Sequence, residues 1–380
     1  MAGLLRSERT RIVLLALSFV LLSALQAGAV TIRRGPLLQN PEDKPSTATL
    51  VWWTDVPGDS TVRWGSDPNH LRMIAVGNDG LRHEVPLTGL PVDSDCYYAL
   101  ETNDKVLWHD HFHTPPGPYP AKRIVFVVIG DFGTTSREHL DIIQRFEALK
   151  PNFIVTVGDN AYDKGSQSEI DENWLVPWRA ILPRYFVYPA LGNHDVMSHG
   201  GRDYLSTWVL PRNNPQKTER YYSFDYGMIH CIVLDSNQPD NTTQTHWLQQ
   251  ELSSSTSYPW KFVFLHHPLY SCDSHYQNDQ ELELKAQKAW GPLFEQYGVD
   301  AVFAGHHHNY QRSRPLGGVR YIITGGGGEK LDPVSGCDDM EVVKSAYEFV
   351  KVSVDPRRAL FEGVDPEGKT LDSFEIKKAS

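Results

Sequence analysis

The apolar, β-branched run at residues 153–157 predicts a buried strand, and it ends in Gly158-Asp159-Asn160-Ala161-Tyr162. A glycine allows the backbone to turn sharply where a strand ends. The two oxygens of the Asp159 carboxylate could bind one metal ion each, and the phenol of Tyr162 could reach one of those ions. Gly-Asp-Asn after a strand is also a common turn sequence, so a metal site needs support from other strand ends.

Four other predicted strands also end in residues able to bind a metal. These ends are Gly130-Asp131 after residues 124–129, Asn193-His194-Asp195 after 186–190, His266-His267 after 262–265, and His306-His307-His308 after 299–304. Sites in open α/β sheets assemble at the carboxyl ends of the strands. Two aspartates, a tyrosine, an asparagine and three of the histidines are enough ligands for two ions and too many for one. Their oxygen and imidazole donors suit iron, zinc or manganese rather than a thiolate-bound structural zinc.

Strands and helical patterns alternate from residue 123 onward, which predicts an α/β domain. Residues 135–138 form a capping-box sequence that would open a helix. The apolar face of that helix would consist of Leu140, Ile143, Phe146 and Leu149. Further helices are predicted around residues 245–252 and 284–296.

The four glycines at residues 325–328 precede Glu329 and Lys330. A phosphate-binding loop requires a glycine directly before its lysine, and this stretch lacks one. We therefore expect a flexible turn beside the site.

Residues 31–115 contain short β-branched and aromatic runs separated by Pro, Gly, Asp and Asn, which is typical of a small antiparallel sandwich. His109, His111 and His113 alternate there and would share one face of a strand. They indicate either a metal site or, as we favour, a half-exposed edge strand. The expected domains are a β-sandwich at 30–116, a stiff proline-rich linker at 117–122 and a catalytic domain at 123–380.

Residues 1–29 have the features of a secretory signal peptide. Arg6, Arg9 and Arg11 precede an apolar run at 12–25, and Ala27-Gly28-Ala29 is a small-x-small cleavage pattern. The apolar run is short for a bilayer span, with a retained membrane anchor as the alternative. We expect cleavage after residue 29, secretion to an extracellular or periplasmic space, and no stable membrane association afterwards.

The chain is acidic, with a formal net charge of −11. Because residues 1–29 hold three arginines and one glutamate, the remainder carries −13. An acidic protein without a basic run is a poor candidate for nucleic-acid binding. Any phosphate site would therefore need positive charge supplied locally, and metal ions are one source.

Four cysteines suit an oxidising compartment but are too few for a disulfide scaffold. Cys272 and Cys337 lie in polar, loop-like stretches and are the pair that we expect to bridge. Cys96 and Cys231 lie in strand-like runs and are expected to be buried, inert thiols. Asn241 begins a glycosylation sequon that matters only in a eukaryotic host.

The five strand ends share one further property, which is their order as sequence blocks. They are Gly-Asp-x-Gly at 130–133, Gly-Asp-x-x-Tyr at 158–162, Gly-Asn-His-Asp at 192–195, Val-x-x-His at 263–266 and Gly-His-x-His at 305–308. This series resembles the signature of the purple acid phosphatases, within the calcineurin-like metallophosphoesterases. Related phosphodiesterases carry a histidine in the first block, where this chain has Gly133. Tyr162 stands where the purple enzymes place their iron-binding phenolate.

The resemblance implies a two-sheet α/β sandwich catalytic domain preceded by a small all-β, fibronectin-III-like sandwich. It also implies an Fe(III) ion paired with a divalent zinc, iron or manganese ion. The implied ligands are Asp131, Tyr162 and His308 for Fe(III), Asn193, His266 and His306 for the divalent ion, and Asp159 between the two. His307 would point away from the ions, and the family pattern assigns no role to His267.

The function implied by the resemblance is that of a secreted acid phosphatase, which hydrolyses small phosphate monoesters with a metal-bound hydroxide as nucleophile. His194 would protonate the leaving alcohol, Asp195 would orient the ring of His194, and His275 would contact the substrate. A metal-dependent phosphodiesterase on the same scaffold is the alternative. A binding protein whose second domain is inactive is a further one.

Overall fold

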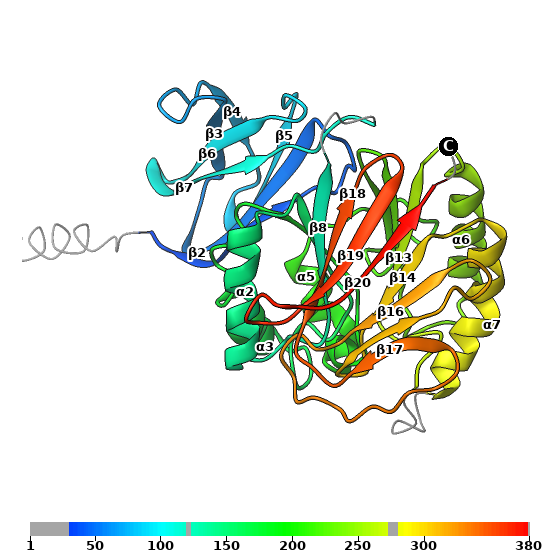
Figure 1. The fold of residues 1–380 in the computed structure, drawn as a ribbon. Helices are drawn as coiled ribbons and strands as arrows, with labels where there is room; N and C mark the ends of the chain where they lie inside the picture. Colours follow the sequence, from blue (N-terminus) through cyan, green and yellow to red (C-terminus); the bar gives the residue numbers. More distant parts are fainter. Residues whose placement is uncertain (1–29, 119–122, 273–279, 379–380) are drawn as a thin grey trace, which may run out of the picture.

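The computed structural model describes residues 30–118, 123–272 and 280–378. The predicted signal peptide, most of the predicted linker and His275 therefore lie outside the described residues. Within the described part of the chain, no helix is both long and apolar enough to cross a membrane. Figure 1 shows a smaller, all-β lobe, coloured blue to cyan, beside a larger lobe that holds the helices.

The smaller lobe consists of two antiparallel sheets within residues 32–113. One sheet has the order β1 (Ile32–Gln39), β2 (Thr47–Gly58) and β5 (Gly80–Thr88), and the other has the order β4 (Met73–Val76), β3 (Thr61–Gly65), β6 (Asp95–Thr102) and β7 (Lys105–His113). Side chains alternate along the strands, so that Val62 and Trp64 of β3 are buried while Arg63 between them is exposed. The fibronectin-III-like assignment of this lobe stays a prediction.

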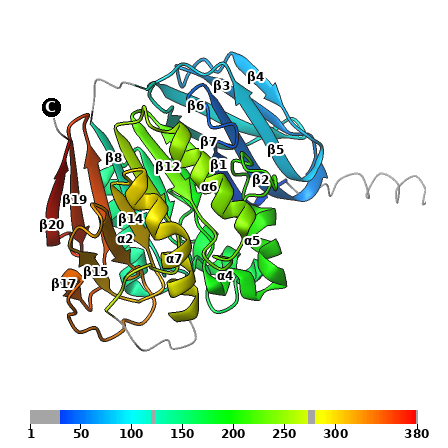
Figure 2. The same cartoon turned by 90° about the vertical axis from the view of Figure 1, so that its right-hand side faces the viewer.

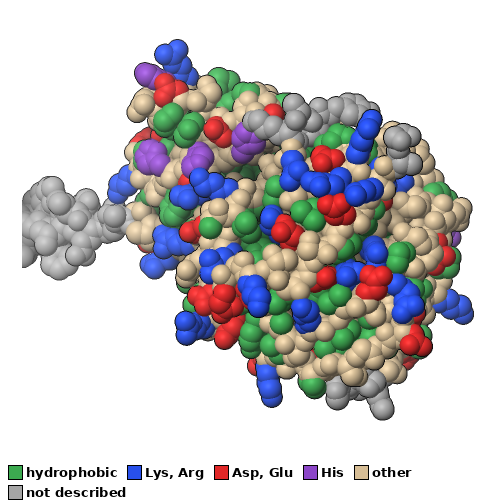
Figure 3. Space-filling view, viewed as in Figure 1, with side chains coloured by type: hydrophobic (Ala, Val, Ile, Leu, Met, Phe, Trp, Pro, Cys, Tyr) green, Lys and Arg blue, Asp and Glu red, His purple; other side chains and the backbone are tan. Residues whose placement is uncertain are grey.

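Strand β7 lies at the edge of its sheet, and His109 and His111 on it are exposed, as expected for a half-exposed edge strand. Figure 3 shows histidines gathered on the surface of this lobe. The ring of His113 lies between two carboxylates, with Nδ1 2.8 Å from Asp95 and Nε2 3.0 Å from Asp93. Both nitrogens of His113 are therefore engaged with protein side chains.

The larger lobe is built on two mixed sheets. The six-stranded sheet has the order β10 (Phe186–Pro189), β9 (Phe153–Thr156), β8 (Ile124–Ile129), β18 (Phe349–Val354), β19 (Arg358–Val364) and β20 (Thr370–Lys377). The seven-stranded sheet has the order β11 (Tyr222–Tyr226), β12 (Ile229–Val233), β13 (Trp260–Phe264), β14 (Ala301–Ala304), β16 (Arg320–Thr324), β15 (Tyr310–Ser313) and β17 (Met340–Lys344). Strands β8 to β10 are parallel, as are β12, β13, β14 and β16, which confirms the predicted α/β class.

Helical segments lie outside these sheets and in the loops that join their strands. They are α2 (Arg137–Leu149), α3 (Gln167–Glu169), η1 (Ile170–Leu175), α4 (Asn193–Met197), η2 (His199–Gly201), α5 (Arg202–Thr207), α6 (Thr242–Ser254) and α7 (Gln280–Gln296). Figure 1 shows α2 outside the first sheet and α6 and α7 outside the second. Figures 1 and 2 agree that the smaller lobe packs against one end of the larger lobe, away from β17.

Aromatic rings fill the space between the two large sheets. The ring of Phe126 on β8 has its centroid 5.7 Å from Phe262 and 6.3 Å from Phe264 on β13, and 6.4 Å from Phe303 on β14. All four side chains are fully buried. Because burial of each such ring contributes roughly 1.5–3 kcal/mol, this cluster holds the two sheets face to face.

Hydrogen bonds join the two lobes at several points. The backbone N–H of Leu38 donates to the carbonyl of Leu182 at 2.8 Å, and the hydroxyl of Tyr98 donates to the carbonyl of Pro183 at 2.9 Å. The guanidinium of Arg34 donates to the carboxylate of Asp171 at 2.5 Å. The smaller lobe is therefore docked on the larger one.

The cysteines lie as predicted. Cys272 and Cys337 form a disulfide, and Cys96 and Cys231 are free and buried. Burial raises the pKa of the Cys96 thiol to about 12, so this thiol is neutral and unreactive.

Helix α2 begins one residue later than the capping-box sequence predicts. Its N-cap is Ser136, whose hydroxyl accepts from the N–H of His139 at 3.3 Å. The prediction of Leu140 as a core position is wrong, because its side chain is 41% exposed. The buried face of the helix consists of His139, Ile142, Ile143 and Phe146.

A neutral imidazole at His139 explains this shift of the buried face. Its Nδ1–H donates to the carbonyl of Thr134 at 2.6 Å, and the indole N–H of Trp178 donates to its Nε2 at 2.8 Å. Burial lowers the pKa of His139 from 6.5 to about 4, although the bond to Thr134 acts in the opposite direction. The folded chain therefore holds His139 uncharged where the unfolded chain would protonate it.

We expect the free energy of unfolding to fall as the pH drops from 6.5 towards 4, because His139 then binds a proton in the unfolded chain but not in the folded chain. The loss should reach about 3 kcal/mol over this window. Urea unfolding at several pH values would measure it. The slope should flatten in His139→Asn and stay unchanged in His246→Asn, which alters an exposed histidine on α6. Equal slopes in all three proteins would contradict the prediction.

Candidate metal centre

The predicted ligands lie directly after strands whose carboxyl ends are level. Ile129 of β8 and Pro189 of β10 both pair with Thr156 of β9, so three strands of the first sheet end in register. The second sheet joins them there, because the N–H of Gly130 donates to the carbonyl of Thr324 at 2.9 Å. The site is therefore assembled where the edges of both sheets meet.

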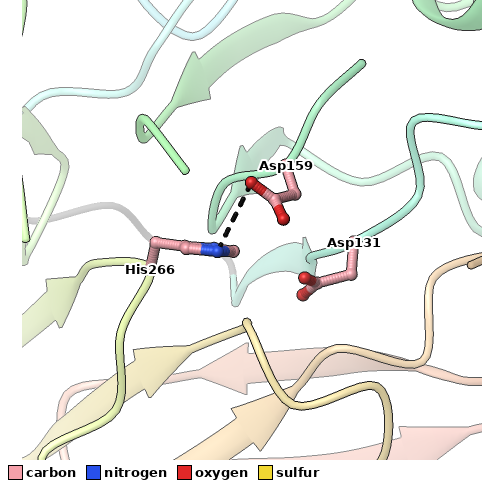
Figure 4. A group of neighbouring side chains, drawn as sticks. All are labelled: Asp131, Asp159 and His266. Carbon is pink, nitrogen blue, oxygen red and sulfur yellow. Dashed lines mark ion pairs between the residues drawn. The ribbon is translucent and has the colours of Figure 1, made fainter. Parts of the chain in front are cut away.

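Asp159 lies at the middle of the donors. Figure 4 shows its carboxylate between the side chains of Asp131 and His266. These three buried residues offer ligand atoms that all lie within 4.8 Å of one another. Oδ1 of Asp159 lies 3.4 Å from Nε2 of His266, and the hydroxyl of Tyr162 donates to Oδ2 at 3.1 Å. The two oxygens of one carboxylate thus face two different partners.

The other donors form two groups on either side of this carboxylate. In the first group, the Tyr162 hydroxyl lies 3.2 Å from Oδ1 of Asp131 and 3.2 Å from Nε2 of His308. In the second group, Oδ1 of Asn193 lies 2.8 Å from Nε2 of His266 and 3.2 Å from Nδ1 of His306. The structure therefore brings all seven predicted metal ligands together, in the two sets that the sequence analysis expects.

The donor set attracts positive charge. Burial lowers the pKa of the two imidazoles His266 and His308, but the carboxylates of Asp159 and Asp131 outweigh it and raise the pKa to about 10 and about 9 respectively. The neighbouring imidazoles hold the pKa of Asp159 below its usual value although burial opposes this. Anionic oxygens and imidazole nitrogens that face one another at this spacing fit the coordination chemistry of iron and zinc.

Backbone carbonyls orient the histidines. The Nδ1–H of His266 donates to the carbonyl of Val157 at 2.8 Å, and the Nδ1–H of His308 donates to the carbonyl of Lys330 at 2.9 Å. Each bond leaves Nε2 to face the other donors, which is the usual way that proteins fix an imidazole ligand.

His194 is oriented in the same way, because its Nδ1–H donates to the carbonyl of Asp163 at 2.5 Å. Its Nε2 lies 3.9 Å from Oδ2 of Asp159. Asp195 does not orient this ring, contrary to the expectation. The oxygens of Asp195 accept instead from the backbone and side-chain amides of Asn160, at 3.0 and 2.7 Å, and from the N–H of Gly192 at 2.8 Å. Asp195 therefore joins two of the ligand loops.

In each of the remaining histidines of the motifs, a ring nitrogen contacts a residue outside the donor set. His307 faces away, with Nε2 2.8 Å from Glu283 on α7. His267 is buried, and its Nδ1 lies 2.9 Å from the hydroxyl of Ser236. The position of His275 falls outside the described residues, so its substrate contact stays a prediction.

The sequence analysis missed Asp235-Ser236-Asn237, which follows β12. The hydroxyl of Ser236 accepts from the backbone N–H of His266 at 3.1 Å, and Asn237 donates to the carbonyl of Gly192 at 3.3 Å. The signal was available, because this is one more run of polar residues at the carboxyl end of an apolar strand.

The calcineurin-like phosphoesterase family matches residues 124–310, a range that holds every predicted metal ligand. Residues 124–310 belong to the calcineurin-like phosphoesterase family. A solved phosphoesterase structure, the purple acid phosphatase PPD1 from yellow lupin seeds, superposes with a TM-score of 0.81 over 90% of this chain and 74% of that one, at 20% identity. This match confirms the metallophosphoesterase fold.

Two curated relatives carry phosphatase names. "Phosphoenolpyruvate phosphatase" of Allium cepa is 30% identical over 75% of this chain, and "Fe(3+)-Zn(2+) purple acid phosphatase 12" of Arabidopsis thaliana is 26% identical over 73% of it. The chain spans 64% of the length of each of these relatives.

The loops around the donors approach one another so closely that only glycine fits at several positions. A Cβ added at Gly192 would overlap Oδ1 of Asp159, and one added at Gly305 would overlap Oδ2 of Asp131. Asp131, Asp159 and His306 also adopt left-handed φ values of 55°, 51° and 73°, which costs about 1 kcal/mol or more each. The loop geometry is therefore held by the surrounding fold.

We expect Gly305→Ala to lower the metal content of the purified protein severalfold, because the added methyl group displaces the Asp131 carboxylate. Elemental analysis would measure metal per chain. Gly291→Ala in α7 is the matched control, since its added Cβ meets nothing within 4 Å. Full metal content in Gly305→Ala would show that Asp131 does not bind the metal from this position.

Proposed function

We propose that this phosphoesterase is a secreted acid phosphatase that hydrolyses phosphate monoesters with an Fe(III) ion and a divalent zinc, iron or manganese ion. The observation that carries the proposal is the division of seven donors into two groups that share one carboxylate, with a phenol in one group. A relative named for an Fe(III)–Zn(II) pair supports the choice of metals.

Asp131, Tyr162 and His308 would hold the ferric ion, and Asp159 would bridge the two ions. Asn193, His266 and His306 would hold the divalent ion. When bound, the two ions would activate water for attack on phosphorus and offset the negative charge of the phosphate. The protein would fix both ions through the carbonyls and amides that orient these side chains.

His194 would donate a proton to the leaving alkoxide, which departs as the alcohol. Its Nδ1–H is committed to the carbonyl of Asp163, so the only nitrogen free to deliver a proton towards the donors is Nε2. The backbone N–H of His194 also donates to Oδ1 of Asp159 at 2.9 Å, which fixes the ring next to the shared carboxylate. This half-buried ring combines a fixed orientation with access from solvent.

The first sequence block supports a monoesterase over a phosphodiesterase. Related diesterases carry a histidine at the position of Gly133, and a Cβ added to Gly133 would overlap the backbone of Asn160 and Ala161. An imidazole has no room there. Tyr162, whose hydroxyl contacts Asp131, Asp159 and His308, takes its place among the donors.

The proposal extends to the rest of the chain. Residues 1–29 would be removed on secretion, and residues 30–116 would form a fibronectin-III-like domain joined by a linker at 117–122 to the catalytic domain at 123–380. The two antiparallel sheets of the smaller lobe and the disulfide support this division and an oxidising destination. The substrate would be a small phosphate monoester, with no role for nucleic acid.

We expect the protein to hydrolyse p-nitrophenyl phosphate faster than bis-p-nitrophenyl phosphate. We also expect the purified protein to contain two metal ions per chain and to show a violet absorption band. Tyr162→Phe should lose the band and keep the divalent ion, because only the phenolate is removed. Elemental analysis, absorption spectra and initial rates would measure this. A faster diester reaction would indicate a phosphodiesterase, and a metal-free, inactive protein would indicate a binding protein.

We expect His194→Ala to retain both ions and to lose roughly 10²-fold or more in kcat, the usual contribution of a general acid. The alanine keeps the backbone N–H that donates to Asp159. His199→Ala is the matched control, since it alters an exposed histidine of the same segment. Full turnover of a metal-loaded His194→Ala protein would remove the proposed role of His194.

A further inference from the structure

The turn Asp235-Ser236-Asn237, here called the β12 turn, follows strand β12 and contains no predicted ligand. We propose that the β12 turn positions the three ligands of the divalent ion. Other elements position Asp131, Tyr162 and His308, here called the tyrosine side of the centre. This inference rests on the proposed function, because it uses the division of the donors into two ion sites. Its consequence is that the two ions can be lost separately.

The Ser236 hydroxyl has all of its hydrogen-bonding capacity engaged. It accepts from the backbone N–H of His266 at 3.1 Å and from that of His267 at 2.9 Å. A hydroxyl has two lone pairs and one proton, so these bonds leave only its proton for Nδ1 of His267, 2.9 Å away. Ser236 therefore fixes the backbone that carries His266 and also sets the tautomer of His267.

His267 extends this support to His306. Because Nδ1 of His267 accepts a hydrogen bond from the hydroxyl of Ser236, the ring is neutral and carries its proton on Nε2. The ring centroid lies 4.6 Å from that of His306, with 47° between the planes. Ser236 thus reaches a second ligand of the divalent ion through one packed imidazole.

Asn237 holds the third ligand loop. One proton of its side-chain amide goes to Oδ1 of Asp235 at 2.9 Å, and the other is shared by the carbonyls of Leu191 and Gly192, at 3.4 and 3.3 Å. Asp235 is itself fixed, because the guanidinium of Arg220 donates to its Oδ2 at 2.7 Å. The peptide that precedes Asn193 is therefore anchored to the β12 turn.

The tyrosine side has different supports. The N–H of His308 donates to Asp332 at 3.1 Å, and the N–H of Asp131 donates to the carbonyl of Gly158 at 3.1 Å. Between the β12 turn and Asp131, Tyr162 or His308, the described residues form no hydrogen bond. Removal of a group that orients a metal ligand typically lowers metal affinity 10- to 100-fold. Loss of the β12 contacts should therefore weaken one ion selectively.

The test compares Ser236→Ala and Asn237→Ala with wild type. We expect bound metal to fall from two ions towards one per chain, and the apparent Kd of added Zn²⁺ to rise about 10-fold or more. The violet band of the tyrosine side should persist in both variants. Ser255→Ala is the matched control, because it removes a buried hydroxyl that donates to Leu252 at the end of α6. Asp332→Ala should show the converse, with a weakened band.

Unchanged Zn²⁺ affinity in Ser236→Ala and Asn237→Ala, or equal loss of both ions, would overturn the inference. Asn237 is only half buried, so Asn237→Ala tests the inference if the Ser236→Ala protein does not fold. If the inference fails but the wild-type protein binds two ions and hydrolyses monoesters, the proposed function is still upheld. Wild-type protein that binds no metal would overturn both.

Discussion

The site depends on one carboxylate, that of Asp159, which both groups of donors contact. Asp159 directs one oxygen towards His266 and the other towards Tyr162, and the N–H of His194 fixes the first oxygen. Because both groups of donors must reach this single side chain, the two sheets have to end at a common edge. The aromatic cluster around Phe126 aligns the sheets, and the bond from Gly130 to the second sheet closes that edge. The packed core thus determines how far apart two ions would be held.

The parallel strands are the part of the fold that sequence patterns predict well. Buried on both faces, they are short continuous apolar runs, and β8 spans the predicted residues 124–129. The antiparallel strands at the end of the chain escaped prediction. Strand β20 contains no fully buried residue, but its half-buried Phe374 and Ile376 alternate with exposed polar residues, a short pattern that was not recognised as a strand. Strand β20 pairs with β19 in antiparallel fashion, and the ring of Phe374 stacks on Phe361 of β19 with their centroids 4.5 Å apart.

The ligands were predictable because each follows a recognisable strand end, whereas the hydrogen-bond partners of the residues that support them were not. Asp195 stands beside His194 in the sequence, yet its carboxylate turns to Asn160 and Gly192, because both residues lie in α4 and consecutive side chains of a helix point in different directions. Which backbone groups a buried carboxylate will accept from depends on how distant loops pack. The same holds for His139, whose burial follows from the carbonyl and indole that satisfy its two nitrogens.

The disulfide between Cys272 and Cys337 closes a covalent ring around a large part of the site. The ring includes α7, β14, β15 and β16, and both His306 and His308 lie within it. A protease that cut the chain once at any point inside this ring would leave two fragments still joined through sulfur. Ligands of both ions would therefore remain tethered to the sheet edge after such a nick, and the fragments would separate only under reducing conditions.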